Sequence, residues 1–146
     1  MESLHYLLMK SHGMFSHKIL LEASKIGLTP GQPKVLDFLL KYQEADQKTI
    51  AAYCEIEPAT VGSILLRMEQ AGLVVRRQKE GNRRSLYVSL TDKGMEAANK
   101  LTDIFQEIEG MATSRLSADE VENLKEILCK ICDTIQSEPQ NKRTNR

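Results

Sequence analysis

The sequence predicts a mostly α-helical protein with a small β-hairpin, and three observations lead to this fold class. Apolar residues recur three and four positions apart in six stretches, which is the period of helices with one buried face. Residues 86–90 instead alternate apolar and polar side chains, and a glycine-containing turn separates them from the apolar run 73–75, as in a hairpin. With 146 residues, of which 41% are hydrophobic and 27% charged, the chain is expected to form one domain. The hairpin residues expected to face inward are Leu86, Val88 and Leu90.

Local signals predict where the helices begin and end. Thr29 is the expected N-cap of the second helix, with Pro30 in its first position, and Asp46 is the expected N-cap of the third. Pro58 is expected to open the fourth helix, and Gly72 to close it in a left-handed conformation. The predicted helices cover residues 2–26, 30–42, 47–55, 58–70, 91–112 and 117–137.

Residues 45–90 follow the order helix, turn, helix, hairpin, which is the order of a winged helix-turn-helix. Helix 58–70 stands in the position of the recognition helix, which enters the DNA major groove. Its apolar face is expected to point inward through Val61, Ile64, Leu65 and Met68. The opposite face is small, hydroxylated and basic, which suits contact with base edges, although an ordinary solvated helix would show the same pattern. The residues expected to meet DNA here are Thr60, Gly62, Ser63 and Arg67.

The tip of the predicted hairpin is basic. Five Lys and Arg residues lie between positions 76 and 84, opposed only by Glu80, although the formal net charge of the chain is zero. Such a cluster can bind phosphate groups at short range. The alternative is that the basic tip is simply exposed to solvent and binds nothing. Beside a helix-turn-helix, we favour nucleic-acid binding. The residues expected to contact DNA from the hairpin are Lys79, Asn82, Arg83 and Arg84.

Three segments resemble the MarR family of bacterial transcriptional regulators. They are GLTPGQ at 27–32, ATVGSILLRMEQAGLV at 59–74 and GNRRSLYVSLTDKG at 81–94. The family usually carries Asp-x-Arg at the wing tip; here Asn82 replaces the Asp, which loses a charge-assisted hydrogen bond. The resemblance covers nearly the whole chain. It implies a single MarR-like domain over 1–137, with the winged helix-turn-helix at about 30–90 and dimerisation helices at about 2–26 and 91–137. Residues 138–146 lack apolar content and are expected to form a disordered tail.

What the resemblance implies about function is a homodimer that binds a pseudo-palindromic operator in double-stranded DNA. Helix 58–70 would enter successive major grooves and the wing arginines the flanking minor grooves, with half-sites about 10 bp apart. The last helix begins with a capping box, Ser117 to Glu120, and its apolar residues suit a seam against a partner's helices. The expected dimer seam consists of Leu4, Leu8, Val121, Leu124, Leu128, Ile131 and Ile135.

Members of this family usually act as repressors released by a small phenolic or other lipophilic ligand, by thiol oxidation or by metal. The histidines at 5, 12 and 17 have no Cys/His/Glu cluster beside them, so no metal site is predicted. The Cys129–Cys132 pair lies late in a helix rather than at an N-terminus, where a reactive thiol is favoured, and Cys54 is interpreted as core. A small-molecule pocket remains as a hypothesis, and its residues would serve equally well as core. They are Met9, His12, Phe15 and Phe38.

Two functional hypotheses follow from the sequence. The first is a sequence-specific DNA-binding transcriptional regulator, a homodimeric repressor released by a ligand. The alternative is a winged-helix interaction or structural module that does not bind DNA. Nothing in the sequence suggests an enzyme, because no nucleophile–base pairing, phosphate loop or metal-ligand spacing is present. No cofactor is expected, and without a signal peptide or membrane span the expected location is the cytoplasm.

Overall fold

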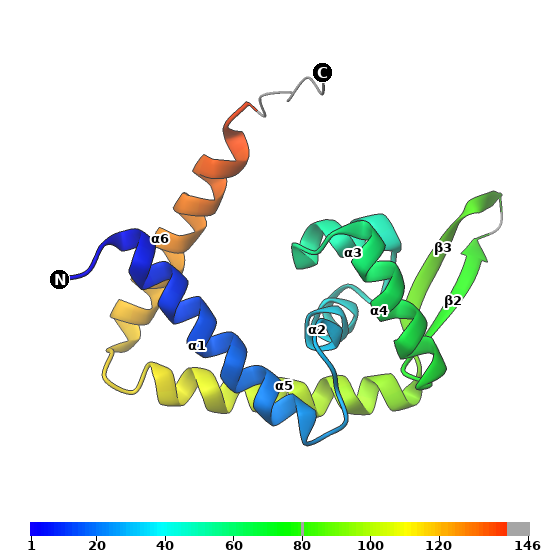
Figure 1. Ribbon diagram of the computed structural model, residues 1–146, viewed down its shortest axis with the longest axis horizontal. Helices are drawn as coiled ribbons and strands as arrows, with labels where there is room; N and C mark the ends of the chain where they lie inside the picture. The colour runs from blue at the N-terminus through cyan, green and yellow to red at the C-terminus, as the bar shows by residue number, and fades with distance from the viewer. Residues whose placement is uncertain (80, 140–146) are drawn as a thin grey trace. The chain divides into compact units, whose positions relative to one another are not determined.

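The computed structural model describes residues 1–79 and 81–139, except for the side chains of residues 82–85. It divides the chain into two units, Met1–Ile108 and Glu109–Arg146. The first unit contains α1 through β3 and most of α5, and the second contains the end of α5 and α6 (Figure 1). The elements are α1 Leu4–Ser24, α2 Gln32–Tyr42, β1 Glu44–Asp46, α3 Gln47–Cys54, α4 Pro58–Gln70, β2 Val74–Lys79, β3 Asn82–Leu90, α5 Asp92–Ala112 and α6 Ala118–Ser137.

The predicted fold class is confirmed, with one strand more than the sequence indicated. Residues 44–46, expected as a plain connection, form β1, which pairs antiparallel with β3. The sheet order is β1-β3-β2, so β3 lies in the middle. Asp46 is both the last residue of β1 and, as predicted, the N-cap of α3: its Oδ1 accepts the Thr49 N–H at 2.8 Å.

The start of α2 differs from the prediction by two residues. Thr29 and Pro30 do not open the helix, because Gly31 follows them with a φ of 87°, which is not a helical conformation. The helix therefore begins at Gln32, whose Oε1 accepts the Thr29 N–H at 3.1 Å. A Cβ on Gly31 would collide with the side chain of Ile64, so the loop before α2 rests directly on α4.

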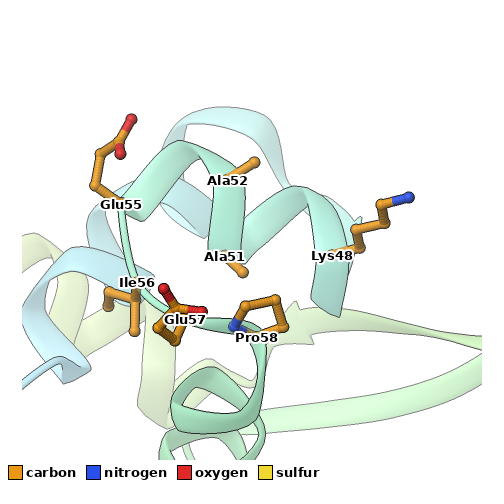
Figure 2. Close-up of a pocket in the computed structure, with 7 residues that line it drawn as sticks. All are labelled: Lys48, Ala51, Ala52, Glu55, Ile56, Glu57 and Pro58. Atoms are coloured by element: carbon orange, nitrogen blue, oxygen red, sulfur yellow. The ribbon is translucent and has the colours of Figure 1, made fainter. Parts of the chain in front are cut away.

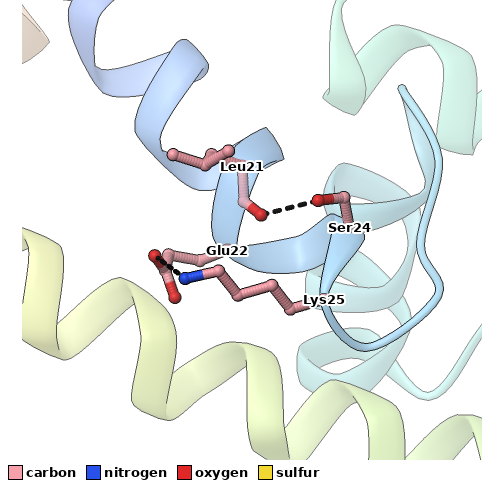
Figure 3. A network of polar contacts seen from close by, with 4 residues as sticks. All are labelled: Leu21, Glu22, Ser24 and Lys25. Carbon is pink, nitrogen blue, oxygen red and sulfur yellow. Dashed lines mark hydrogen bonds and ion pairs between the residues drawn. The ribbon is translucent and has the colours of Figure 1, made fainter.

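Short-range polar contacts close the last turn of α1 (Figure 3). Ser24 Oγ donates a hydrogen bond to the Leu21 carbonyl at 2.6 Å, and Lys25 Nζ pairs with Glu22 Oε1 at 2.8 Å. Gly27 then takes a φ of 82° and turns the chain, so the predicted stop lies within three residues of the observed end of α1.

The core of the first unit lies between the helices and the inner half of the sheet. The predicted inward face of α4 is confirmed, since Val61, Leu65 and Met68 are fully buried and Ile64 is half-buried. The prediction for Leu86 is wrong: this side chain is 42% exposed, whereas Val88 in the same strand is fully buried. The outer part of the hairpin therefore extends beyond the core. The largest fully buried side chains are Leu36, Leu39, Ile50, Leu65, Met68 and Leu101.

The second unit is built around α6. Its capping box forms as predicted: Ser117 Oγ accepts the Glu120 N–H at 3.1 Å, and Glu120 Oε1 accepts the Ser117 N–H at 3.0 Å. Of the expected seam residues on α6, Leu124, Leu128 and Ile135 are exposed, while Val121 and Ile131 are half-buried. In the first unit, Leu4 and Leu8 of α1 are also exposed. The predicted tail extends past residue 139, and residues 140–146 lie outside the described part of the chain.

Candidate nucleic-acid interface

The corner between α3 and α4 sets the direction of the predicted recognition helix. Gln47, at the start of α3, donates from Nε2 to the Pro58 carbonyl at the start of α4, at 3.1 Å. A Cβ on Gly62 would lie 3.0 Å from the same Nε2. Gly62 was predicted to face DNA, but it is half-buried and lies against Gln47. Its lack of a side chain lets α3 and α4 approach each other.

The solvent-facing side of α4 carries the other predicted contacts. Ser63 and Arg67 are exposed one turn apart, and the exposed Leu66 lies beside them. Ser63 Oγ is 3.5 Å from the Ala59 carbonyl, a long contact that leaves the hydroxyl free to turn toward a ligand. Thr60 is exposed as well, but it lines a hollow on the side of α4 that faces α1 and α5. Ser63 and Arg67 are therefore the predicted residues that share an outward face.

The end of α4 is joined firmly to the start of α5. Gly72, as predicted, follows the helix with a φ of 75°, and its carbonyl accepts a hydrogen bond from Thr91 Oγ1 at 2.5 Å. Thr91 Oγ1 in turn accepts the Gly94 N–H at 3.0 Å, and Lys93 Nζ donates to the Ala71 carbonyl at 2.8 Å. A Cβ on Gly94 would overlap the Leu73 carbonyl, so the two segments are in backbone contact. We call these contacts the α4–α5 joint. It satisfies carbonyl groups that a helix end leaves open.

The wing consists of β2 and β3, which pair from Val74↔Leu90 to Lys79↔Asn82 with a register shift between Gln78 and Lys79. Successive side chains on a strand point to opposite faces. On the inner face, Arg76 is half-buried and pairs with Glu69 of α4 at 3.2 Å. Arg77 belongs to the outer face, opposite Tyr87 in the register, and is exposed. The cations of β2 are thus divided between two faces.

Lys79 was predicted to contact DNA, and it has an acidic partner. Its Nζ lies 2.8 Å from Glu44 Oε1 of β1 and 4.3 Å from the centre of the Tyr87 ring. The hydrogen bond to Glu44 raises the pKa of Lys79 above its ordinary value. The side chains of Asn82, Arg83 and Arg84 lie outside the described residues, so their contacts with DNA stay predictions. Sequence reasoning missed Glu44 and Glu69, because neither adjoins its partner along the chain.

A hollow of about 390 Å3 lies behind α4 within the first unit. Its lining is mostly apolar, with Lys34, Ser16 and Thr60 as polar members. Ile64 and Thr60 come from α4 and Phe105 from α5, so an occupant would contact both helices of the α4–α5 joint. The lining residues are Ser16, Ile19, Leu20, Pro30, Gly31, Pro33, Lys34, Ile56, Thr60, Ile64 and Phe105.

The residues predicted to line a ligand pocket are not those of this hollow. Met9 and His12 are exposed on α1, and Phe15 is half-buried. Phe38 is buried one turn farther along α2, where its ring centre lies 4.9 Å from that of Tyr42 and 4.8 Å from that of Tyr53. The hollow is lined by the next turns of α1 instead, and by a loop and helices whose proximity the sequence did not indicate.

A second, more open groove of about 410 Å3 runs along the α3–α4 turn (Figure 2). Lys48 lies at one end and Glu55 at the other, and Glu57 also lines it. Two carboxylates against one ammonium group make this groove unsuitable for phosphate. The groove therefore adds no anion-binding surface to the outward face that carries Ser63 and Arg67.

The remaining candidate sites are the cysteines. Cys54 is buried, and burial raises the pKa of its thiol, which disfavours the reactive thiolate. Cys129 and Cys132 are exposed on α6. Within residues 1–79 and 81–139, no group of three or more His, Cys, Asp or Glu side chains is arranged to hold a metal ion. No helix in the described part of the chain is long and apolar enough to cross a membrane.

Comparisons with known proteins agree with this geometry. The MarR family model matches residues 28–86. The chain is 30% identical over 111 residues to the organic hydroperoxide resistance transcriptional regulator of Bacillus subtilis, covering 76% of this chain and 74% of that protein. It is also 30% identical to the HTH-type transcriptional regulator MgrA of Staphylococcus aureus, covering 80% and 76%. The crystal structure of the S. aureus MepR–DNA complex matches with a TM-score of 0.83 and 25% identity, covering 92% of this chain and 99% of that one. The chain belongs to the MarR family of DNA-binding transcriptional regulators, which are not enzymes.

Proposed function

We propose that this regulator is a homodimeric repressor that reads a pseudo-palindromic operator and is released by a small apolar ligand. The observation that carries the proposal is the outward face of α4, where Ser63 and Arg67 are exposed immediately before a basic hairpin. A hydroxyl and a guanidinium group on one helical face are suited to base edges in the major groove. The similarity to MepR, which was crystallised with DNA, supports the same mode of binding.

The wing supplies the sequence-independent part of this binding. Arg77 is exposed on its outer face, and Arg83 and Arg84 follow at the start of β3. Arginines that meet phosphates or a narrow minor groove position the protein without reading the major-groove pattern. In this proposal, Arg67 provides specificity and the wing arginines provide affinity.

A dimer is supported by the apolar side chains that each unit leaves exposed. Leu4 is 67% exposed on α1, and Ile135 is 68% exposed on α6. Leu124, Ile127 and Leu128 continue the exposed row on α6 with helical spacing. Rows of this kind are typical of interfaces with a second chain. Two copies would place two α4 helices on successive turns of DNA, about 10 bp apart.

Release by a ligand is supported by the hollow behind α4. Its volume of about 390 Å3 lies in the range of small-molecule sites, and its lining is mostly apolar with Lys34 at the edge. A small apolar acid suits this lining, because the ring would contact Ile19 and Phe105 while the carboxylate pairs with an ammonium group. Because Ile64 and Thr60 belong to the recognition helix, a ligand in the hollow would contact α4 directly and could shift its position.

The test is in vitro selection of duplex DNA on the purified protein, carried out with and without salicylate as a phenolic probe. We expect an inverted repeat with half-sites about 10 bp apart, and weaker retention of that duplex at millimolar probe. Arg67→Ala should cost about 1–3 kcal/mol and relax the preference at one position of each half-site. Arg115→Ala removes the same charge outside the helix-turn-helix and serves as the control.

Each part of the proposal can fail separately. If the enriched motif is not an inverted repeat, the proposal that a symmetric dimer binds the operator is wrong. If Arg67→Ala weakens binding to every sequence equally, Arg67 is a phosphate contact rather than a base contact. If salicylate and other small phenolic acids produce neither release nor heat of binding, the hollow is not a site for this ligand class.

A further inference from the structure

The outer face of the wing sheet carries a contact that crosses all three strands. Lys79 stands on β2, Tyr87 on the middle strand β3, and Glu44 on β1. Lys79 Nζ lies over the Tyr87 ring at 4.3 Å from its centre and reaches Glu44 Oε1 at 2.8 Å. The two edge strands do not pair with each other, so this contact joins them directly. We call the three side chains the wing brace.

The brace attaches at the point where the sheet narrows from three strands to two. β1 pairs with β3 only from Tyr87 to Ser89, so beyond Tyr87 the sheet is a two-stranded ribbon. Leu86 is exposed there, and the register shifts between Gln78 and Lys79. A two-stranded ribbon without a covered apolar face is only marginally stable. The brace connects this ribbon to the third strand and, through it, to the body of the domain.

The electrostatics of the brace argue against Lys79 as a phosphate contact. Glu44 neutralises the ammonium charge at 2.8 Å, and a carboxylate at that position would repel a phosphate brought to Lys79. The hydrogen bond to Glu44 also raises the pKa of Lys79, which is a further sign that the ammonium group is engaged with the carboxylate. On the same face, Arg77 is exposed opposite Tyr87 and has no ion pair among the described residues. Arg77 therefore fits a phosphate better than Lys79 does.

We infer that Glu44, Tyr87 and Lys79 are positioning residues for DNA binding: they hold the wing at the angle that brings its arginines to DNA, and Lys79 itself makes no phosphate contact. The inference rests on the proposed role of the wing in operator binding. Charge repulsion alone would predict that removing the Glu44 carboxylate strengthens DNA binding. If Glu44 positions the wing, its removal should instead weaken binding.

The experiment measures the affinity of Glu44→Gln, Lys79→Gln and the double variant for a labelled duplex carrying the repeat selected on the wild-type protein. Affinities are taken between about 50 and 200 mM salt, because the slope of log affinity against log salt counts phosphate contacts. Glu96→Gln is the matched control, since it removes one partner of an exposed Lys–Glu pair, with Lys100, on α5. The charge-swapped variant Glu44→Lys with Lys79→Glu tests whether the pair, rather than either charge, is what matters.

With a working brace, Glu44→Gln and Lys79→Gln each weaken binding about two- to five-fold, as expected for an exposed ion pair. The double variant is then no worse than either single variant, the salt slope falls by clearly less than the loss of one phosphate contact would cause, and the charge swap restores affinity. In the protein without DNA, backbone amides of 74–79 and 86–90 exchange hydrogen faster in Glu44→Gln but not in Glu96→Gln.

The opposite pattern overturns the inference. If Lys79→Gln lowers the salt slope by about 1 while Glu44→Gln binds as tightly as wild type or tighter, Lys79 is a phosphate contact. If the charge swap stays as weak as Lys79→Gln, the pair has no positioning role. A wild-type protein that binds no duplex at all would instead count against the proposed operator binding, and hydrogen exchange would still decide whether the brace holds the wing.

Discussion

The recognition helix and the wing are neighbours in the first unit, yet they are held in different ways. The end of α4 is fixed at the α4–α5 joint by hydrogen bonds to main-chain carbonyls and by the backbone contact at Gly94. The outer wing is fixed by the exposed pair of Lys79 and Glu44. Salt screens exposed ion pairs but has little effect on the hydrogen bond from the uncharged Thr91 hydroxyl to the Gly72 carbonyl or on the backbone packing at Gly94. The direction of α4 should therefore be insensitive to ionic strength, whereas that of the wing should depend on it.

The largest expected effect comes from filling the joint. In Gly94→Ala, the new Cβ would overlap the Leu73 carbonyl, and a backbone atom cannot move aside cheaply. We expect a loss of about 3 kcal/mol in the free energy of unfolding, measured by urea titration, and a parallel loss of DNA affinity. Gly110→Ala in the same helix has open space around its Cβ and should be neutral or stabilising by up to about 1 kcal/mol. Equal stability of the two variants would show that the joint is not tight.

A smaller effect is expected from removing the hydroxyl at the centre of the joint. Thr91→Val loses both the donation to the Gly72 carbonyl and the acceptance from the Gly94 N–H. The cost should be about 1–2 kcal/mol by urea titration, with little change between low and high salt. Thr102→Val is the control, because the Thr102 hydroxyl bonds only within its own helix, to Ala98. A strong salt dependence of the stability difference between Thr91→Val and wild type would show that the α4–α5 joint is as sensitive to salt as the wing.

The smallest effect concerns the strand to which the brace is anchored. Asp46 ends β1, and hydrogen bonds from Thr49 lower the pKa of its carboxyl. Because the folded pKa is below the unfolded one, the stabilisation is complete above the ordinary Asp value and is lost as pH falls through the folded pKa. Asp46→Asn keeps a capping side chain, so we expect a deficit of only about 0.5 kcal/mol at neutral pH. The deficit should vanish in acid; a constant deficit from neutral pH to strong acid would assign it to another cause.

The features that sequence predicted well are those with local causes. The bounds of α4 follow from Pro58 and Gly72, because each of these residues has a backbone preference that acts at its own position in the chain. The caps at Asp46 and Ser117 depend on partners three residues away. Strand β1 was not predicted because the residues Glu-Ala-Asp have no preference for strand structure, and because its pairing partner lies more than forty residues later in the sequence.

The exposure of the candidate DNA-contacting residues on α4 could be predicted from the sequence, but the partners of the wing residues could not. The outward position of Ser63 and Arg67 follows from helical periodicity. The contact of Gly62 with Gln47 could not be predicted, because periodicity does not say which side of α4 meets α3. The Lys79–Glu44 pair depends on the sheet order, and the hollow depends on how α1, α4 and α5 approach one another. Contacts between segments that are distant in the sequence cannot be predicted from any short stretch of it.

The close approach of Gly31 to Ile64 has a consequence for genetics. Gly31 combines a φ of 87° with a Cβ position already filled by the end of the Ile64 side chain, so any replacement strains the loop and must also push aside a side chain of α4. A screen for alleles that abolish regulation should therefore recover missense changes at codon 31 alongside those at Arg67. Such alleles would score as defects in DNA binding although Gly31 is not among the residues proposed to contact DNA.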